Sequence, residues 1–277
     1  MKNKKTRYMT ILTAAIALSL TSCVKDELFN TPHPDLGAGI VTTDKSAEAE
    51  IPQNYTLRME TEEQAVSGII NTFKTLLPQG SYELTAFNTP EHIGISGNTA
   101  TVAESEPGYM EPMPGYLFSA HQTIDVMADD TLKVTVPVKQ LVRLLNVELT
   151  VTEGDYNRVQ SATATLDGVA SRIDIVTGER STAAKSLNTL VQNGNKFTTS
   201  FRLLGIIPSA SQKLTVSILF TNGDTQQTES DDILTDFNDR TEAKTLTGNL
   251  LLPIEAGVTG ATITDWKETD GGDVDAN

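Results

Sequence analysis

Residues 213–223 have the sequence KLTVSILFTNG, and this stretch decides the fold class. Four apolar residues stand at every second position of it: Leu214, Val216, Ile218 and Phe220. Because successive side chains of a strand point to opposite faces of a sheet, this alternation predicts a half-buried β-strand. Asn222 and Gly223 follow, and an Asn-Gly pair suits the positive φ angles of a tight hairpin turn. The stretch therefore predicts one strand and the turn that leads into the next.

Short runs with the same alternation recur along the chain, and most are bounded by Gly, Asn, Asp or Pro. They lie at residues 55–60, 82–87, 93–96, 99–102, 132–136, 141–151, 162–166, 197–206, 245–254 and 261–266. Beyond the N-terminal segment, helical spacing of apolar residues never persists over three turns. Only 185–191 and 232–237 favour short helices. Strands spaced in this way are typical of β-sandwiches, so we predict an all-β protein.

Chain length and one proline predict two domains. With 277 residues and 38% hydrophobic content, each half of the chain can bury a core of its own. Pro137 ends the run at 132–136, because proline cannot donate to a hydrogen-bond ladder in the middle of a sheet. We therefore predict one β-sandwich over 37–137 and a second over 138–268, followed by a flexible acidic tail over 269–277.

The N-terminus has the pattern of a lipoprotein signal peptide. A basic start precedes the apolar segment 9–20, which is too short to cross the hydrocarbon core of a membrane, about 30 Å thick. The residues that end this segment resemble the lipobox of bacterial lipoproteins: Leu20, Thr21, Ser22 and Cys23. Cys23 is the only cysteine in the sequence, which excludes a disulfide within the chain. We predict a signal peptide over 1–22, an acyl lipid on Cys23 and a lipidated tether over 23–36.

The charged residues directly after the predicted lipid site indicate on which side of the outer membrane the protein lies. Lys25, Asp26 and Glu27 resemble the surface-export signal of Bacteroidetes lipoproteins. That resemblance implies an anchor in the outer membrane that faces outward. A solvated, charged tether explains the same residues, and the two interpretations differ only in which side of the outer membrane carries the protein. We predict exposure at the cell surface.

The net charge excludes one class of partner. The chain has 21 Lys and Arg against 36 Asp and Glu, which gives a net charge of -15. Removal of residues 1–22 would make it more acidic still, because that segment holds basic residues and no acidic ones. A surface of this sign repels phosphate backbones, and attraction to phosphates normally dominates nucleic-acid affinity. We therefore expect no nucleic-acid partner.

Residues that catalyse reactions or bind metals are sparse. The three histidines, at positions 33, 92 and 121, do not pair with one another or with a carboxylate at a metal-ligand spacing. Three acidic runs lack the alternating aspartates of a calcium loop, and solvated turns explain them: 129–130, 231–232 and 236–239. We predict no metal, no cofactor and no enzymatic activity. Two carboxylates that converge in an apolar cleft would instead indicate a hydrolase.

Aromatic residues gather in one segment. Tyr109, Tyr116 and Phe118 form the one cluster that could stack against a sugar ring, in a chain with 5% aromatic residues. The other interpretation is a loop whose tyrosines and methionines pack against the sheet. Trp266, the single tryptophan, is better explained by packing in the core or at a sheet edge.

Four stretches, taken in order, resemble a known family. They are FNTPHPD at 29–35, YELTAFNTPEH at 82–92, MPGYLF at 113–118 and RLLG at 202–205. Together with the lipobox, they look like the FimB-type fimbrillin-related surface lipoproteins of Bacteroidetes, over nearly the whole chain after the signal peptide. One detail departs from that pattern, since Lys45 stands where the family has a tryptophan in its first strand.

The resemblance implies two transthyretin-like, Greek-key β-sandwiches in tandem. It also implies a fimbrial anchor or accessory subunit whose partners are other fimbrial subunits, bound by β-strand complementation. An open groove in a sandwich leaves backbone groups unpaired, and an extended segment of a partner satisfies them while filling alternate side-chain pockets. A surface glycan-binding lipoprotein with a similar sandwich is the alternative.

Proteolysis after an arginine frees the first strand in polymerising members of such a family. Arg58 is the only arginine between Arg7 and Arg143, so it is the one candidate for processing in the N-terminal half. Its alternating surroundings also fit an exposed strand residue, which favours a subunit that keeps its first strand and its lipid. That first strand is expected at 39–43.

Overall fold

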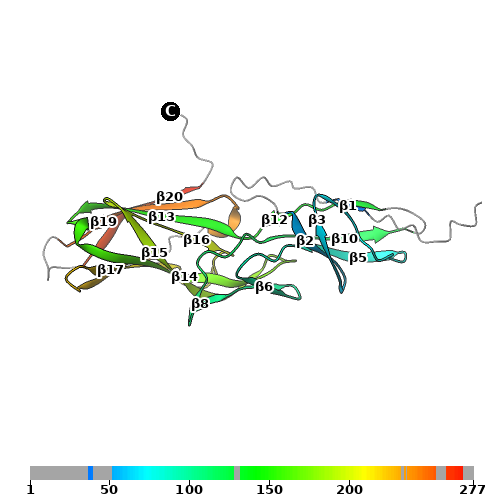
Figure 1. The fold of residues 1–277 in the computed structure, drawn as a ribbon, viewed down its shortest axis with the longest axis horizontal. Helices are drawn as coiled ribbons and strands as arrows, with labels where there is room; N and C mark the ends of the chain where they lie inside the picture. Colours follow the sequence, from blue (N-terminus) through cyan, green and yellow to red (C-terminus); the bar gives the residue numbers. More distant parts are fainter. Residues whose placement is uncertain are drawn as a thin grey trace, which may run out of the picture.

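The computed structural model describes residues 37–39, 52–127, 132–231, 234, 236–253 and 260–270. Strands dominate these residues, which confirms the prediction of an all-β protein (Figure 1). Helical backbone within them is limited to two short 3-10 turns, η2 (Tyr156–Arg158) and η3 (Phe237–Asp239). The lipobox residues and the predicted export signal lie outside the described residues.

The strands differ in length between the two halves of the chain. Those up to residue 140 are β1 (Gly37–Gly39), β2 (Asn54–Met59), β3 (Glu62–Ser67), β4 (Ile70–Thr72), β5 (Gly80–Phe87), β6 (Ile93–Ser96), β7 (Thr99–Val102), β8 (Glu104–Glu106), β9 (Tyr109–Met110), β10 (Phe118–Val126), β11 (Lys133–Thr135) and β12 (Lys139–Gln140). The longer ones that follow are β13 (Arg143–Glu153), β14 (Val159–Asp174), β15 (Arg180–Asn193), β16 (Lys196–Leu203), β17 (Lys213–Phe220), β18 (Thr225–Asp231), β19 (Lys244–Leu251) and β20 (Thr262–Asp270).

The larger half is a sheet in the order β18-β17-β14-β15-β16-β13-β19-β20 that folds into two layers. Strand β15 makes the fold possible, because its residues 180–190 pair with β14 and its last residues, 191–193, pair with β16. Figure 1 shows β13, β19 and β20 above and β14 and β17 below, with β15 crossing between the layers.

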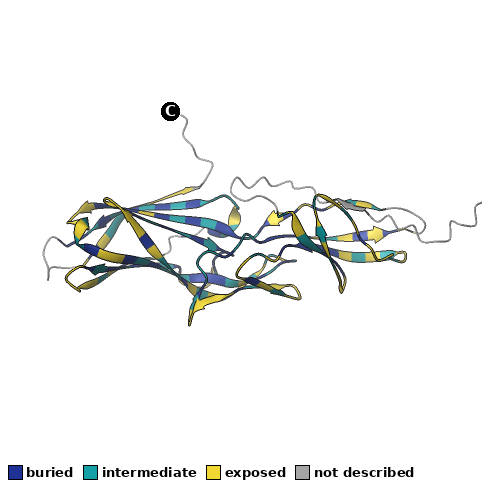
Figure 2. Cartoon of the chain, viewed as in Figure 1, coloured by how far each residue is buried: buried dark blue, intermediate teal, exposed yellow. Residues whose placement is uncertain are grey.

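One large hydrophobic core fills the space between these layers. Buried positions alternate with less buried ones along β13, β16, β17 and β19, as a two-residue period requires (Figure 2). In β17 the four buried residues are those that the sequence indicated: Leu214, Val216, Ile218 and Phe220. Burial of each such side chain contributes about 1.5–3 kcal/mol. Gly223, at φ 89°, forms the turn to β18, which confirms the predicted hairpin.

The smaller half has two sheets over a second core. Five strands lie in the order β12-β10-β5-β2-β3, and three lie in the order β11-β1-β4. The side chains that fill the core between them come from β2, β5 and β10 and from the segments beside β4 and β11; they include Leu57, Leu84, Phe73, Ile124 and Val136. The two cores are separate clusters of buried residues.

Strands β6 to β9 connect the halves. The hairpin of β6 and β7, predicted at 93–102, is present and pairs through β7 with β14. Strand β9 pairs in parallel with β15. Residues 93–110 therefore belong by hydrogen bonding to the larger sheet, although they lie before the domain border placed at 137 and 138. That border stays a prediction.

The short helix expected at 185–191 is wrong, because these residues belong to the strand β15. Leu187, Leu190 and Val191 have helical spacing, but 183–190 pair along their length with β14, and these long-range hydrogen bonds override a weak local preference. The helix expected at 232–237 lies partly outside the described residues. Its described end contains buried Leu234 and leads into η3, which begins at Phe237.

Candidate functional site

The three-stranded sheet of the smaller half has an unusual central strand. β1 lies between β11 and β4, parallel to the first and antiparallel to the second. Its residues Gly37–Gly39 stand opposite Lys133–Thr135 on one side and Ile70–Thr72 on the other. The first strand of the chain, expected at 39–43, thus begins earlier, and 40–43 lie outside the described residues.

β1 has the sequence Gly-Ala-Gly. Both residue types are poor strand formers. Its three residues rely on backbone hydrogen bonds, each of which contributes about 0.5–1.5 kcal/mol net. The central position of this sheet is therefore filled by residues of low strand propensity.

The wall made by β4 is fixed without help from β1. The Gln64 side chain of β3 donates to the Thr72 carbonyl oxygen over 2.9 Å and accepts from the Lys74 amide over 2.7 Å. The Asn71 amide donates to the Tyr55 hydroxyl and to the Gly68 carbonyl oxygen. Burial raises the pKa of the Tyr55 hydroxyl, against the opposing effect of the hydrogen bond from Asn71, so the phenol stays neutral and donates to Gly68.

The opposite wall, β11, continues into the core. Val134 of this strand is partly buried, and Val136 and Val138, which follow it, are buried. With β1 between them, β11 and β4 define a site that we call the strand slot: β11, β1 and β4. Loss of β1 would expose unpaired backbone groups on both walls, which is the condition for capture of a partner strand.

Exposed apolar side chains border the strand slot. Ile69 and Ile70, at the start of β4, are 71% and 82% exposed. Within the described residues, the outer edge of β4 has no strand partner. An edge strand that presents isoleucine to solvent is a suitable surface for another chain.

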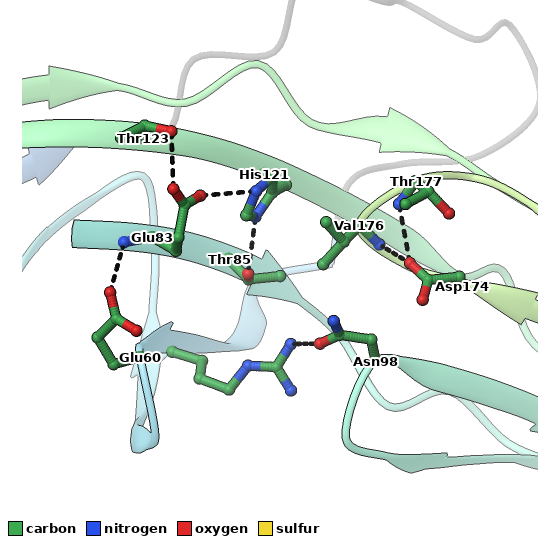
Figure 3. Close-up of polar contacts among 10 residues, drawn as sticks. Glu60, Glu83, Thr85, Asn98, His121, Thr123, Asp174, Val176 and Thr177 are labelled. Atoms are coloured by element: carbon green, nitrogen blue, oxygen red, sulfur yellow. Dashed lines mark hydrogen bonds and ion pairs between the residues drawn. The ribbon is translucent and has the colours of Figure 1, made fainter. Parts of the chain in front are cut away.

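The outer face of the five-stranded sheet is polar and self-paired instead (Figure 3). Glu83 of β5 lies 2.8 Å from Nε2 of His121 on β10, and Thr123 donates to the same carboxylate. The His121 Nδ1 atom is 3.1 Å from the Thr85 hydroxyl. This order of groups resembles a catalytic triad, but Thr85 is buried, at 3% exposure, so its hydroxyl is withheld from any substrate. Sequence reasoning missed this cluster; the spacing of Glu83 and Thr85 along one strand was its only signal.

Arg58 joins the two halves and is not an exposed strand residue, so that interpretation is wrong. It is 9% exposed because the turn of β6 and β7 covers it. Its guanidinium donates to the Gly97 carbonyl oxygen over 2.6 Å and to Oδ1 of Asn98 over 2.5 Å, and it stacks on the Phe87 ring. Proteolysis after Arg58 stays a prediction; the bond in question lies in β2, which is paired on both sides.

The predicted aromatic cluster is divided among different environments. Phe118 is buried in the smaller core, so its ring is not available to a sugar. Tyr116 packs against both cores and lies under the guanidinium of Arg202, 4.3 Å from its ring centre. Tyr109 is half-buried in β9. Trp266 of β20 is partly buried against the larger core, as packing predicted.

Comparison with known proteins identifies the family. The model for fimbrillin-A associated anchor proteins Mfa1 and Mfa2 matches residues 41–271. The chain belongs to this family. The predicted membership of a fimbrial anchor family is confirmed, and so is the prediction of a non-enzymatic protein. None of the curated proteins matches the sequence.

Solved structures show how far the fold of this anchor family extends. The fimbrial anchor protein Mfa2 from Porphyromonas gingivalis is 11% identical, with a TM-score of 0.58, over 85% of this chain and 96% of that chain. A candidate adhesin from Bacteroides ovatus is 10% identical, with a TM-score of 0.62, over 86% and 96%. A candidate polysaccharide-binding protein from Bacteroides thetaiotaomicron is 9% identical, with a TM-score of 0.56, over 87% and 99%. At these identities the likeness concerns the fold.

Membership of the anchor-protein family places the protein at the cell surface, in the fimbrium. The structure gives two further facts about the residues that it describes. No helix among them has the length and apolar character to cross a membrane. Nor do they contain a group of three or more His, Cys, Asp and Glu side chains that could hold a metal ion.

Proposed function

We propose that this protein is a fimbrial anchor or accessory subunit that stands on the outer surface of the outer membrane and binds a neighbouring subunit by β-strand complementation. A lipid on Cys23 holds it to the membrane, and Lys25, Asp26 and Glu27 direct it outward. The two cores support an arrangement of two transthyretin-like Greek-key sandwiches in tandem, with the border near Pro137.

The strand slot is the single observation that carries the strand-complementation mechanism. Its central strand has three residues of Gly-Ala-Gly sequence, whereas its walls are fixed by Gln64, Asn71 and the valines of the core. An extended segment of another subunit that carries larger side chains gains the same backbone hydrogen bonds and more apolar contact. Replacement of β1 by such a segment is therefore favourable and needs no catalytic residue.

A disulfide across the slot tests this mechanism. Gly37 and Thr72 are direct neighbours in the antiparallel pair of β1 and β4, so Gly37→Cys with Thr72→Cys locks β1 in place. The oxidised protein, purified from cells in its lipidated form, should lose the fimbrial subunits that copurify with wild type, and reduction should restore them. The matched control is Thr215→Cys with Glu229→Cys, a neighbouring pair of β17 and β18 in the larger half. Equal recovery of fimbrial subunits with β1 locked and unlocked would refute the mechanism.

Protease treatment of intact cells tests the lipid anchor and the side of the membrane. Wild type should be digested while a periplasmic marker stays intact, and Cys23→Ala should be protected or released from the membrane. Full protection of wild type would put the protein on the periplasmic side and would refute its role as a surface anchor.

A further inference from the structure

A cavity of about 320 Å³ opens at the end of the larger half where the chain enters it from β12. One wall is the segment 139–143, which leads from β12 into β13, and the opposite walls are the turn between β14 and β15 and the segment that contains η3. Small-molecule sites in proteins begin at about this size. We call it the junction cavity; it is separate from the strand slot and shares no residue with it.

The junction cavity is basic in an acidic protein. Its lining includes four cationic side chains and one carboxylate: Lys139, Arg143, Arg180, Arg240 and Asp239. The chain as a whole carries a net charge of -15. A local excess of positive charge inside a concave site attracts anions even when the overall field repels them, because low-dielectric walls focus the local field.

Arg180 is the cation best placed for a ligand. Its Nε donates to the Leu204 carbonyl oxygen over 2.6 Å, and this is the one hydrogen bond of its guanidinium within the described part of the chain. Burial lowers the pKa of Arg180, and Asp239 opposes that shift, although the side chain stays protonated at neutral pH. A partly desolvated guanidinium with free N–H groups gains from a bound carboxylate, which it meets with two parallel hydrogen bonds.

The surrounding backbone holds Arg180 in position. Gly205 has φ 134°, and a Cβ atom there would overlap the Cδ and Nε atoms of Arg180. The Asn238 side chain pairs with both backbone groups of Ile206, accepting over 2.9 Å and donating over 3.0 Å. Arg143 donates to the Phe237 carbonyl oxygen over 2.8 Å and stacks on its ring. The walls are therefore fixed before a ligand arrives, which lowers the entropic cost of binding.

We infer that the junction cavity binds a small carboxylate-bearing ligand of the size of a hexuronic acid, with Arg180 as the residue that meets the carboxylate. The volume suits a single small molecule and not an extended strand. This inference does not depend on strand complementation.

Calorimetric titration of the full chain with galacturonate tests the inference. Galacturonate should bind, and galactose, which lacks the carboxylate, should not. Arg180→Gln should weaken galacturonate binding at least tenfold, whereas Arg172→Gln, which removes an exposed arginine of β14 outside the cavity, should leave it unchanged. Gly205→Ala should also weaken it, because the added Cβ displaces Arg180.

Thermal unfolding of each variant shows whether the fold survives. If Arg180→Gln does not fold, Arg240→Gln takes its place, since Arg240 is exposed and lines the same cavity. Three outcomes would overturn the inference: no heat of binding with galacturonate, equal binding of inorganic phosphate, or binding of a short aspartate-rich peptide in place of the sugar acid.

Discussion

The two halves of the molecule differ in how they protect the edge strands of their sheets, whose backbone groups would otherwise stay unpaired. In the larger half, the two end strands of the sheet, β18 and β20, contact each other, and the amide of Ala261, just before β20, donates to the Gln226 side chain of β18. The buried Lys244 of β19 pairs with Glu268 of β20. The smaller half keeps short strands, an exposed isoleucine pair and a glycine-rich strand at the centre of one sheet. The difference teaches that the larger half protects its end strands, whereas the smaller half is the one that the proposed strand complementation would use.

Truncation in the scaffold core should have the largest effect on stability. Phe201 of β16 is fully buried in the larger core, so Phe201→Ala leaves a cavity and should lower the free energy of unfolding by about 3–5 kcal/mol. Urea denaturation followed by circular dichroism measures the change. A loss below about 1 kcal/mol would contradict a closely packed scaffold.

Removal of the Arg58 contact between the halves should have the second-largest effect on the free energy of unfolding. Arg58→Met keeps an apolar stem over Phe87 but removes both hydrogen bonds to the β6–β7 turn, so the free energy of unfolding should fall by about 2–3 kcal/mol. Arg172→Met, at an exposed site, is the control and should change it by less than about 0.5 kcal/mol. Equal stability of the two variants would show that Arg58 does not couple the halves.

The alternation of apolar residues and the positions of turn residues predicted many strands of the larger half. Leu214 to Phe220 alternate, and the turn after them contains Asn222 and Gly223, so neighbours in sequence are also neighbours in space. The strand slot is different, because Gly37 pairs with Lys133 and no local signal links them. A strand of glycine and alanine has no apolar alternation to detect.

For the residues of the candidate site, too, the local sequence pattern did not reveal contacts with distant segments. Arg58 was expected on the surface because its neighbours alternate, but the turn that buries it comes 39 residues later in the chain. Likewise, Leu187 and Leu190 have helical spacing, and only pairing with β14 made that segment a strand. Both predictions were wrong because a segment distant in sequence, and not a sequence neighbour, determines the burial or the backbone pairing of these residues.

Amide hydrogen exchange should separate the slot strand from the scaffold. The amides of β1 should exchange faster than those of β13 and β14, by about tenfold or more, because a three-residue strand has a much shorter hydrogen-bonded ladder than strands of 11 and 16 residues. Mass spectrometry of peptic peptides reports the rates. Protection of β1 equal to that of β13 would mean that the slot does not open, and strand replacement would lose its basis.

The smallest effect on stability is expected at the rim of the slot. Ile70 is exposed, so Ile70→Lys should alter the free energy of unfolding by no more than about 0.5 kcal/mol. The same change places a charge beside the incoming strand, and it should therefore reduce the fimbrial subunits that copurify with the protein. Val191→Lys, at an exposed apolar site of the larger half, is the matched control and should leave copurification unchanged. If both variants lost the fimbrial subunits equally, the contact surface would not be specific to the smaller half.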